Sequence, residues 1–162
     1  MNRYFHCTPA LGAAVCALAP WLAAPPLLAQ APPAPPTVAA SPSAQITSEL
    51  QAGSAAADAW LTRLDAGDYA GTWRDAAAPF QAAVDAAKWS SGIGDLRAKY
   101  GKMLSRKLLV SRFSTTMPGG PDGRYAFLQY VTNFEHKQGA IETIVPMLDK
   151  DGRWKISGYY IK

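Results

Sequence analysis

The chain has 162 residues, a formal net charge of +4 and two cysteines, Cys7 and Cys16. Its basic residues are scattered along the chain and do not form a dense stripe with stacking aromatics, which argues against a nucleic-acid-binding surface. Because both cysteines lie near the N-terminus, the rest of the chain can hold neither a disulfide framework nor a thiolate metal site.

Residues 1–31 have the pattern of a secretory signal peptide. Arg3 supplies a positive start, the stretch LGAAVCALAPWLAAPPLLA is apolar and uncharged, and the small-x-small sequence AQA ends at Ala31. Cleavage after Ala29 is the competing position, because Pro32 would follow a cut after Ala31. Prolines interrupt the apolar run, which is also short for the roughly 20 residues of a membrane span. We therefore expect a cleaved signal, a periplasmic or secreted location and no membrane association of the mature chain.

A linker and a helical region should follow the signal. Residues 32–45, PPAPPTVAASPSAQ, are rich in Pro, Ala and Ser and cannot bury a core, so we expect them to be extended or disordered. Residues 46–162 have a suitable length for one folded domain. Apolar residues at helical spacing from Ile46 to Leu64 predict a first helix, which should end at Gly67.

Three shorter helical pieces are expected next. Asp68 should cap a second, short helix, and Pro79 suits the first turn of a third. Gly92 and Gly94 should then interrupt the helical pattern, and Asp95 should begin a last helical piece.

From residue 103 the apolar pattern changes to that of β-strands. Four strands are predicted, over residues 103–116, 124–136, 140–149 and 153–161. The short turn sequences PGGPDG, KQG and KDG separate them, so neighbouring strands should pair antiparallel as a meander. Helices followed by strands predict an α+β domain with its N-terminal helices packed on one face of a four-stranded antiparallel meander sheet.

Side-chain alternation predicts which strand residues share a face. The last strand should direct toward the core the residues Trp154, Ile156 and Tyr160. Tyr159 should then face the opposite side. The same rule places Arg106 and Arg112 together on one face of the first strand, and it leaves open whether that face is concave or convex.

Five segments of the chain, in order, resemble a known family. They are AWLTRLDAGDYAGTW, LRAKYGKMLSRKL, PGGPDGRYAFLQYVTNFEHK, IETIV and DGRWKISGYYI. Together they span about residues 57–161 and resemble a bacterial exported family catalogued as domain of unknown function 4019, whose name carries no established activity. The LDAGDYAGTW and DGRWKISGYYI segments also look like the nuclear-transport-factor-2-like (cystatin-like cone) superfamily. That likeness implies helices packed into the concave face of a curved sheet, with a conical cavity between them. The same shape serves isomerases, dehydratases and binding modules.

Arg106 and Glu142 are the first candidates for a ligand-binding site. Both lie on predicted strands, and a planar guanidinium can bind a carboxylate through two parallel hydrogen bonds. A buried contact between them would be structural, whereas an Arg106 that faces an open cavity would hold an anionic ligand.

Glu135, Tyr69 and Tyr130 complete the set of candidates. Glu135 and Glu142 flank the HKQG turn and could face each other as paired carboxylates, with Tyr69 or Tyr130 as a partner in acid–base chemistry. The alternative for each acid is an ion pair with an arginine such as Arg97.

No catalytic or metal-binding motif is present. His136 is the only histidine outside the signal, and beside Lys137 at a turn we expect it to be solvated. One histidine without cysteine leaves a transition-metal site short of ligands. The DKDG sequence starts like a calcium loop, but Arg153 and Tyr160 occupy its fifth and twelfth positions. We therefore predict no catalytic residue, no metal and no cofactor.

These observations favour a non-enzymatic periplasmic domain that binds a small ligand or another envelope protein through the cone mouth or the sheet. The second hypothesis is a small-molecule enzyme with isomerase- or dehydratase-like chemistry in the cone, and the third is a structural module that forms homodimers. A cavity with a desolvated carboxylate near a tyrosine would favour the enzyme. A filled core and an apolar exposed sheet face would favour assembly.

Overall fold

The computed structural model describes residues 41–162, which form an α+β unit of four helices followed by four strands. The helices are α1 (Pro42–Asp65), α2 (Tyr69–Arg74), α3 (Ala78–Ala83) and α4 (Ala86–Tyr100). The strands are β1 (Met103–Ser114), β2 (Tyr125–Phe134), β3 (Ala140–Leu148) and β4 (Trp154–Ile161). The predicted α+β class is confirmed. None of these four helices has the length and hydropathy to cross a membrane.

Helix α1 begins inside the segment that was predicted to be a linker. The side chain of Ser41 caps the helix by accepting a hydrogen bond from the Ala44 N–H, and Pro42 occupies the first turn, where a helix needs no donor. Residues 42–45 are therefore helical and not extended, because this Ser-Pro start signal outweighs the Pro/Ala/Ser composition. The predicted signal peptide and the linker up to residue 40 lie outside the described residues.

Predicted capping residues define the short helices. Gly67, whose φ is 83°, follows the end of α1, and the Asp68 carboxylate accepts a hydrogen bond from the Gly71 N–H at 2.9 Å at the start of α2. Pro79 lies in the first turn of α3. Local sequence signals were therefore sufficient to predict where α1 ends and where α2 and α3 begin.

Helix α4 runs without a break through Gly92 and Gly94, so the predicted interruption and the restart at Asp95 are wrong. An interior glycine costs about 1 kcal/mol relative to alanine. This helix has a capped first turn at Asp85 and buries Ile93 in the core. Tertiary packing outweighs the local cost.

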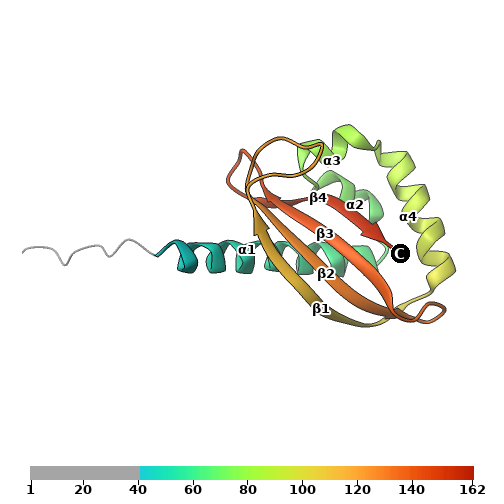
Figure 1. The fold of residues 1–162 in the computed structure, drawn as a ribbon. Helices are drawn as coiled ribbons and strands as arrows, with labels where there is room; N and C mark the ends of the chain where they lie inside the picture. The colour runs from blue at the N-terminus through green and yellow to red at the C-terminus, as the bar shows by residue number, and fades with distance from the viewer. Residues whose placement is uncertain (1–40) are drawn as a thin grey trace, which may run out of the picture. The chain divides into compact units, whose positions relative to one another are not determined.

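The sheet is an antiparallel meander with the strand order β1-β2-β3-β4, as predicted. Helix α1 contacts all four strands, and in Figure 1 it passes behind them. The main core joins this helix to the sheet through Ala57, Trp60, Leu61, Leu64, Leu128, Tyr130, Ile144, Ile156 and Tyr159. We call the side of the sheet that α1 covers the inner face and the opposite side the outer face.

A β-bulge reverses the predicted alternation of β4. The register with β3 shifts between Val145 and Pro146, which leaves Ser157 as an extra residue in β4. Tyr159 is consequently buried and Tyr160 is 56% exposed, so the prediction for these two residues is wrong.

A second bulge changes the faces of β1. The register with β2 shifts at Leu109, which is an extra residue. Arg106 lies opposite Thr132 on the inner face, whereas Arg112 lies opposite Phe127 on the outer face. The prediction that the two arginines share a face is therefore wrong.

Candidate functional site

Glu142 is the centre of a buried polar network on the inner face. Arg106 donates to its carboxylate through Nε at 2.6 Å and through Nη2 at 3.2 Å. The Tyr159 hydroxyl donates at 2.6 Å, and the Thr132 hydroxyl donates from β2. A fully buried carboxylate is costly unless its lone pairs are occupied, and these donors account for its position in the core.

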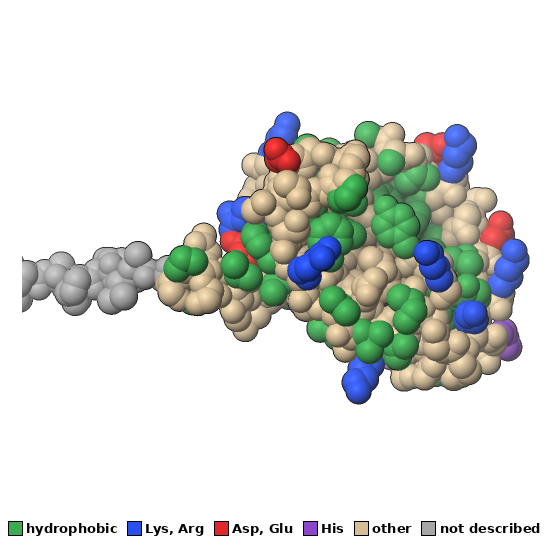
Figure 2. All heavy atoms as spheres, viewed as in Figure 1, with side chains coloured by type: hydrophobic (Ala, Val, Ile, Leu, Met, Phe, Trp, Pro, Cys, Tyr) green, Lys and Arg blue, Asp and Glu red, His purple; other side chains and the backbone are tan. Residues whose placement is uncertain are grey.

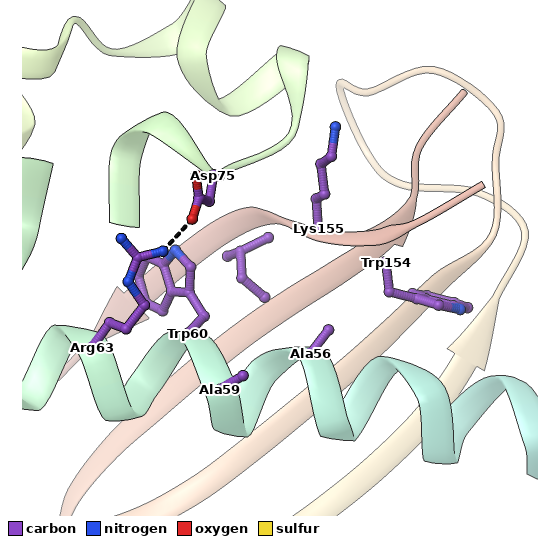
Figure 3. A pocket seen from close by; sticks show the side chains of 8 residues that line it. Ala56, Ala59, Trp60, Arg63, Asp75, Trp154 and Lys155 are labelled. Atoms are coloured by element: carbon purple, nitrogen blue, oxygen red, sulfur yellow. Dashed lines mark hydrogen bonds and ion pairs between the residues drawn. The ribbon is translucent and has the colours of Figure 1, made fainter. Parts of the chain in front are cut away.

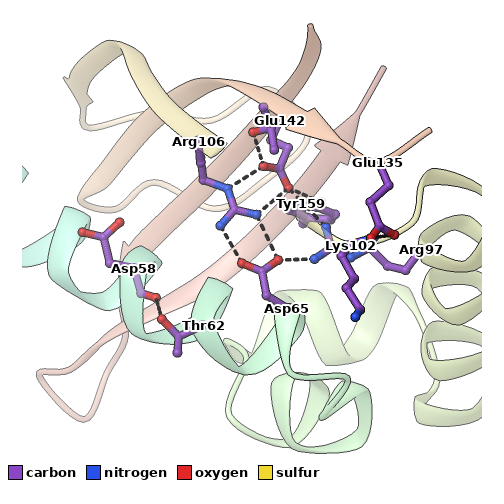
Figure 4. A network of polar contacts seen from close by, with 10 residues as sticks. Asp58, Thr62, Asp65, Arg97, Lys102, Arg106, Glu135, Glu142 and Tyr159 are labelled. Carbon is purple, nitrogen blue, oxygen red and sulfur yellow. Dashed lines mark hydrogen bonds and ion pairs between the residues drawn. The ribbon is translucent and has the colours of Figure 1, made fainter. Parts of the chain in front are cut away.

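Asp65 and Arg97 extend the network to the helices. Asp65, the last residue of α1, accepts hydrogen bonds from Arg106 at 2.7 and 3.1 Å and pairs with Arg97 of α4. Nη1 of Arg97 lies 4.0 Å from Oε1 of Glu142. The four charges thus alternate around a ring that joins α1, α4, β1 and β3 (Figure 4). Their formal charges sum to zero, as expected of a structural clamp.

The protonation states match this structural role. Burial disfavours a charged Arg106, but hydrogen bonds to its two carboxylates outweigh this effect and raise its pKa above the usual value. Burial, together with the charge of Glu142, raises the pKa of Tyr159. Burial and the nearby Asp58 raise the pKa of Tyr130 to about 12. Neither tyrosine is therefore tuned to exchange a proton near neutral pH, as an acid–base catalyst would be.

The predicted contact between Arg106 and Glu142 is present, and Tyr130 lies near it without joining it. The Tyr130 hydroxyl lies 3.4 Å from the carboxylate of Asp58 on α1. The tyrosine is buried with the rest of the main core.

Glu135 and Tyr69 lie elsewhere, at a surface cleft. The carboxylate of Glu135 accepts a hydrogen bond from the Lys102 backbone N–H at 2.8 Å. It is exposed, whereas Glu142 is buried, so the two are not paired carboxylates. The cleft has a volume of about 450 Å³ and is lined by Asp65, Tyr69, Gly94, Arg97, Ala98, Gly101, Lys102, Glu135 and His136. The cleft is lined by both acidic and basic side chains, so its charge favours neither an anionic nor a cationic ligand.

Sequence reasoning named Arg106, Glu142 and Arg97 but missed Asp65, Thr132 and Tyr159. Asp65 lies four positions after the buried Leu61, and Arg97 lies four positions after the buried Ile93. A charged residue on an apolar helical stripe was therefore the available signal. No comparable signal existed for Tyr159, because the bulge decides its direction.

Aromatic rings fill the space between the helices and the sheet above Tyr159. The ring centroid of Trp60 lies 5.5 Å from that of Tyr159 and 5.8 Å from that of Trp89. Phe80 packs edge-on against Trp89 at 5.0 Å. The ring of Tyr159 therefore lies against a packed aromatic layer.

A small hollow lies at the surface between α1 and β4 (Figure 3). It has a volume of about 190 Å³, and Trp60 and Trp154 form part of its wall. Asp75 is its only acid, and that side chain pairs with Arg63. The hollow thus presents no free carboxylate to a substrate.

Large apolar side chains are exposed mainly on β1. The exposed members in residues 41–162 are Ile46, Leu104, Leu108, Leu109, Val110 and Tyr160. Four of these six belong to β1, which is an edge strand. Clustered exposed apolar residues commonly mark interaction surfaces.

The outer face combines apolar and basic side chains. One row across the strands contains Lys107, Val131 and Ile141, and the next contains Val110 and Tyr160. Glu142 is the only acidic residue in the four strands, and it points to the inner face, so the outer face carries no acid from the strands. Figure 2 shows this side, where hydrophobic and basic side chains occur over the strands and acidic side chains lie toward the margin.

The comparison with family models matches residues 56–159, which include Arg97, Arg106, Glu142 and Tyr159. The matching family is described as "Protein of unknown function (DUF4019)". The comparisons with curated proteins and with solved structures gave no match. Because the matched region covers more than half of the chain, it confirms the resemblance to this family. The chain belongs to the DUF4019 family.

Proposed function

We propose that this domain is a non-catalytic protein-binding module of the bacterial cell envelope, which binds its partner through the outer face and the β1 edge of the sheet. One observation carries the proposal. The charged groups of the Glu142 network are paired with one another, whereas four of the six exposed large apolar side chains of residues 41–162 belong to β1.

The state of Glu142 supports binding over acid–base catalysis. A general base needs a free lone pair directed at a substrate. The Glu142 carboxylate instead accepts hydrogen bonds from Arg106, Thr132 and Tyr159 and is fully buried. A nuclear-transport-factor-2-like shape alone would not make this domain an enzyme. Isomerase- or dehydratase-like chemistry would also require an open cavity at the Glu142 carboxylate.

The sequence pattern of residues 1–31 supports the envelope location. Its charged start, apolar run and small-residue cleavage site are those of an export signal. Residues 41–162 contain no cysteine, so export to an oxidising compartment would not change their covalent structure.

The charge of the outer face favours a different protein over a second copy. Lys107 and Arg112 have no ion-pair partner within residues 41–162. Two stacked outer faces would bring four such cations together without an acid from the strands, and like charges across an interface are unfavourable. The partner surface should therefore be acidic.

Site-specific photo-crosslinking in cells tests the proposal. A photoreactive amino acid replaces Val110 on the outer face, or Lys88 on the exposed side of α4 as the matched control. We expect one discrete adduct with a different protein from position 110 and none from position 88. In the background of Lys107→Glu with Arg112→Glu, the adduct should weaken.

Two outcomes would overturn the proposal. An adduct between two copies of the chain would identify the domain as a dimerisation module. The absence of an adduct from position 110, in cells where the variant is folded and abundant, would show that this face is not a docking surface.

A further inference from the structure

We infer that the partner presents an extended segment with alternating apolar and acidic side chains, which adds as a fifth strand to the free edge of β1. This inference rests on the proposed function and specifies the chemistry of its partner. It depends on the edge strand, on a groove beside that strand and on the distribution of charge around both.

The outer edge of β1 is available for pairing. This strand has 12 residues, and within the described part of the chain only β2 pairs with it. An edge strand presents a row of unpaired backbone N–H and C=O groups, which proteins usually cover or interrupt. The bulge at Leu109 divides the edge, but residues 110–114 keep a regular register with β2. This stretch can therefore accept another strand.

A groove between α1 and β1 lies beside this regular stretch. One hollow, of about 410 Å³, is lined by Ser111 of β1 and by residues of α1 that include Leu50. A second hollow, of about 320 Å³, is lined by Phe113 of β1 and by residues that include Ile46 of α1. Ser111 and Phe113 both face inward and are two positions apart. Because side chains of a strand alternate, an added strand would direct every second side chain into these hollows in turn.

The hollows favour apolar side chains. Leu50 contributes apolar surface to the first, and Ile46 and Phe113 contribute it to the second. The first hollow also contains the carboxylate of Asp58, which would repel an acidic side chain. In the second hollow Glu49 is paired with Arg124, which lines the same hollow, so this pair contributes no net charge.

The opposite side of the added strand would meet positive charge. Its outward side chains would lie next to Val110 and Arg112 on the outer face, and Lys107 lies on the same face beyond the bulge at Leu109. Arg112 lies over the ring of Phe127 at 5.5 Å and keeps its charge exposed. Acidic residues at the outward positions would pair with these cations. The two sides of β1 therefore select opposite residue types and fix the register of the peptide.

Peptide binding to the purified full chain tests the inference. The probe is a short, fluorescently labelled synthetic peptide of alternating valine and glutamate, and the readout is fluorescence anisotropy at low salt. We expect saturable binding of this peptide. A peptide of the same composition with all valines before all glutamates should bind at least about tenfold more weakly, which corresponds to about 1.4 kcal/mol.

N-methylation of the peptide separates strand addition from simple charge attraction. Methyl groups on the backbone nitrogens that face β1 should abolish binding, because they remove the pairing donors. Methyl groups on the alternate nitrogens, which face away from the sheet, should be tolerated. Equal binding of both methylated peptides and of the rearranged peptide would overturn strand addition.

Charge reversal tests the selectivity of the outer side. Lys107→Glu with Arg112→Glu should weaken binding of the glutamate peptide by about tenfold or more and should permit binding of an alternating valine–lysine peptide. Lys99→Glu with Lys137→Glu, which makes the same change in net charge at exposed positions outside β1, should have little effect. Circular dichroism confirms that both variants are folded.

The remaining outcomes are distinguishable from failure of the proposed function. If the position-110 adduct forms in cells but neither peptide binds, the docking proposal holds and strand addition is wrong. If vesicles of anionic phosphatidylglycerol bind and the peptides do not, the basic and apolar surface recognises a membrane, and the inference is overturned.

Discussion

Arg106 on β1 reaches across β2 to bind Glu142 on β3, with Nε 2.6 Å from Oε2 and Nη2 3.2 Å from Oε1. The strand between them contributes Thr132, which lies opposite Arg106 and donates to the same carboxylate. These contacts therefore join three consecutive strands, and Tyr159 of β4 and Asp65 of α1 extend the network to the fourth strand and to the helix.

A double-mutant cycle on Arg106 and Glu142 should show strong coupling. Arg106→Met or Glu142→Gln alone should lower the free energy of unfolding by roughly 3–5 kcal/mol, because each leaves a buried group without its partner. The double variant should lose less than the sum of the single losses. Urea unfolding measures the free energy of unfolding of the wild type, the two single variants and the double variant.

Arg153→Ala is the control for this cycle. Arg153 pairs with Asp151 at an exposed position, and removal of such a pair should cost at most about 1 kcal/mol. Zero coupling between Arg106 and Glu142 would contradict the structural role of their contact.

Stability should fall at alkaline pH because of the buried tyrosines. An unfolded tyrosine has a pKa of about 10, whereas in the folded protein burial and Glu142 raise the pKa of Tyr159, and burial and Asp58 raise that of Tyr130 to about 12. Above about pH 10 the unfolded chain releases protons that the folded chain retains. This contribution is complete below about pH 10 and is lost as the pH rises through the folded pKa values.

Urea unfolding between about pH 8 and pH 11 measures this alkaline loss. Tyr159→Phe should make the decline shallower, even though the variant is less stable at neutral pH because Glu142 loses a donor. Tyr160→Phe, at an exposed neighbouring position, should leave the slope unchanged. Identical slopes for the two variants would show that Tyr159 does not contribute to the loss of stability at alkaline pH.

Adjacent tyrosines should respond very differently to truncation. Tyr159→Ala should cost roughly 3–5 kcal/mol, because its ring packs against Trp60 in the core. Tyr160→Ala should change stability by no more than about 0.5 kcal/mol, because its side chain is 56% exposed. Thermal melts of the two variants test the position of the bulge, since regular alternation predicts the reverse order.

Two helical glycines should respond in opposite directions to alanine. Gly92→Ala should stabilise the protein by about 0.5–1 kcal/mol, because a Cβ there meets no atom within 4 Å and alanine is the better helix former. Gly53→Ala should destabilise it by about 1–3 kcal/mol, because a Cβ there would lie 2.8 Å from the Cβ of Ala126. Chemical denaturation of both variants gives the comparison, and a stabilised Gly53→Ala protein would show that α1 can move away from β2.

The sequence alone was sufficient for the type and order of the elements. Asp68 and Pro79 predicted helix starts, and short turn sequences predicted an antiparallel meander, because capping and turn formation depend on neighbouring residues. The sequence offered a contact between Arg106 and Glu142 as one of two alternatives, and the structure shows that contact.

Tertiary structure alone decided which side chains meet. A bulge inserts one residue and reverses every later side chain of the strand, so Leu109 and Ser157 determined the directions of Arg112 and Tyr159. Helix α4 continued through two glycines because packing against the core outweighed local propensity. The bulges and the unbroken helix depend on packing between segments that are far apart in the chain, so no local sequence pattern predicts them.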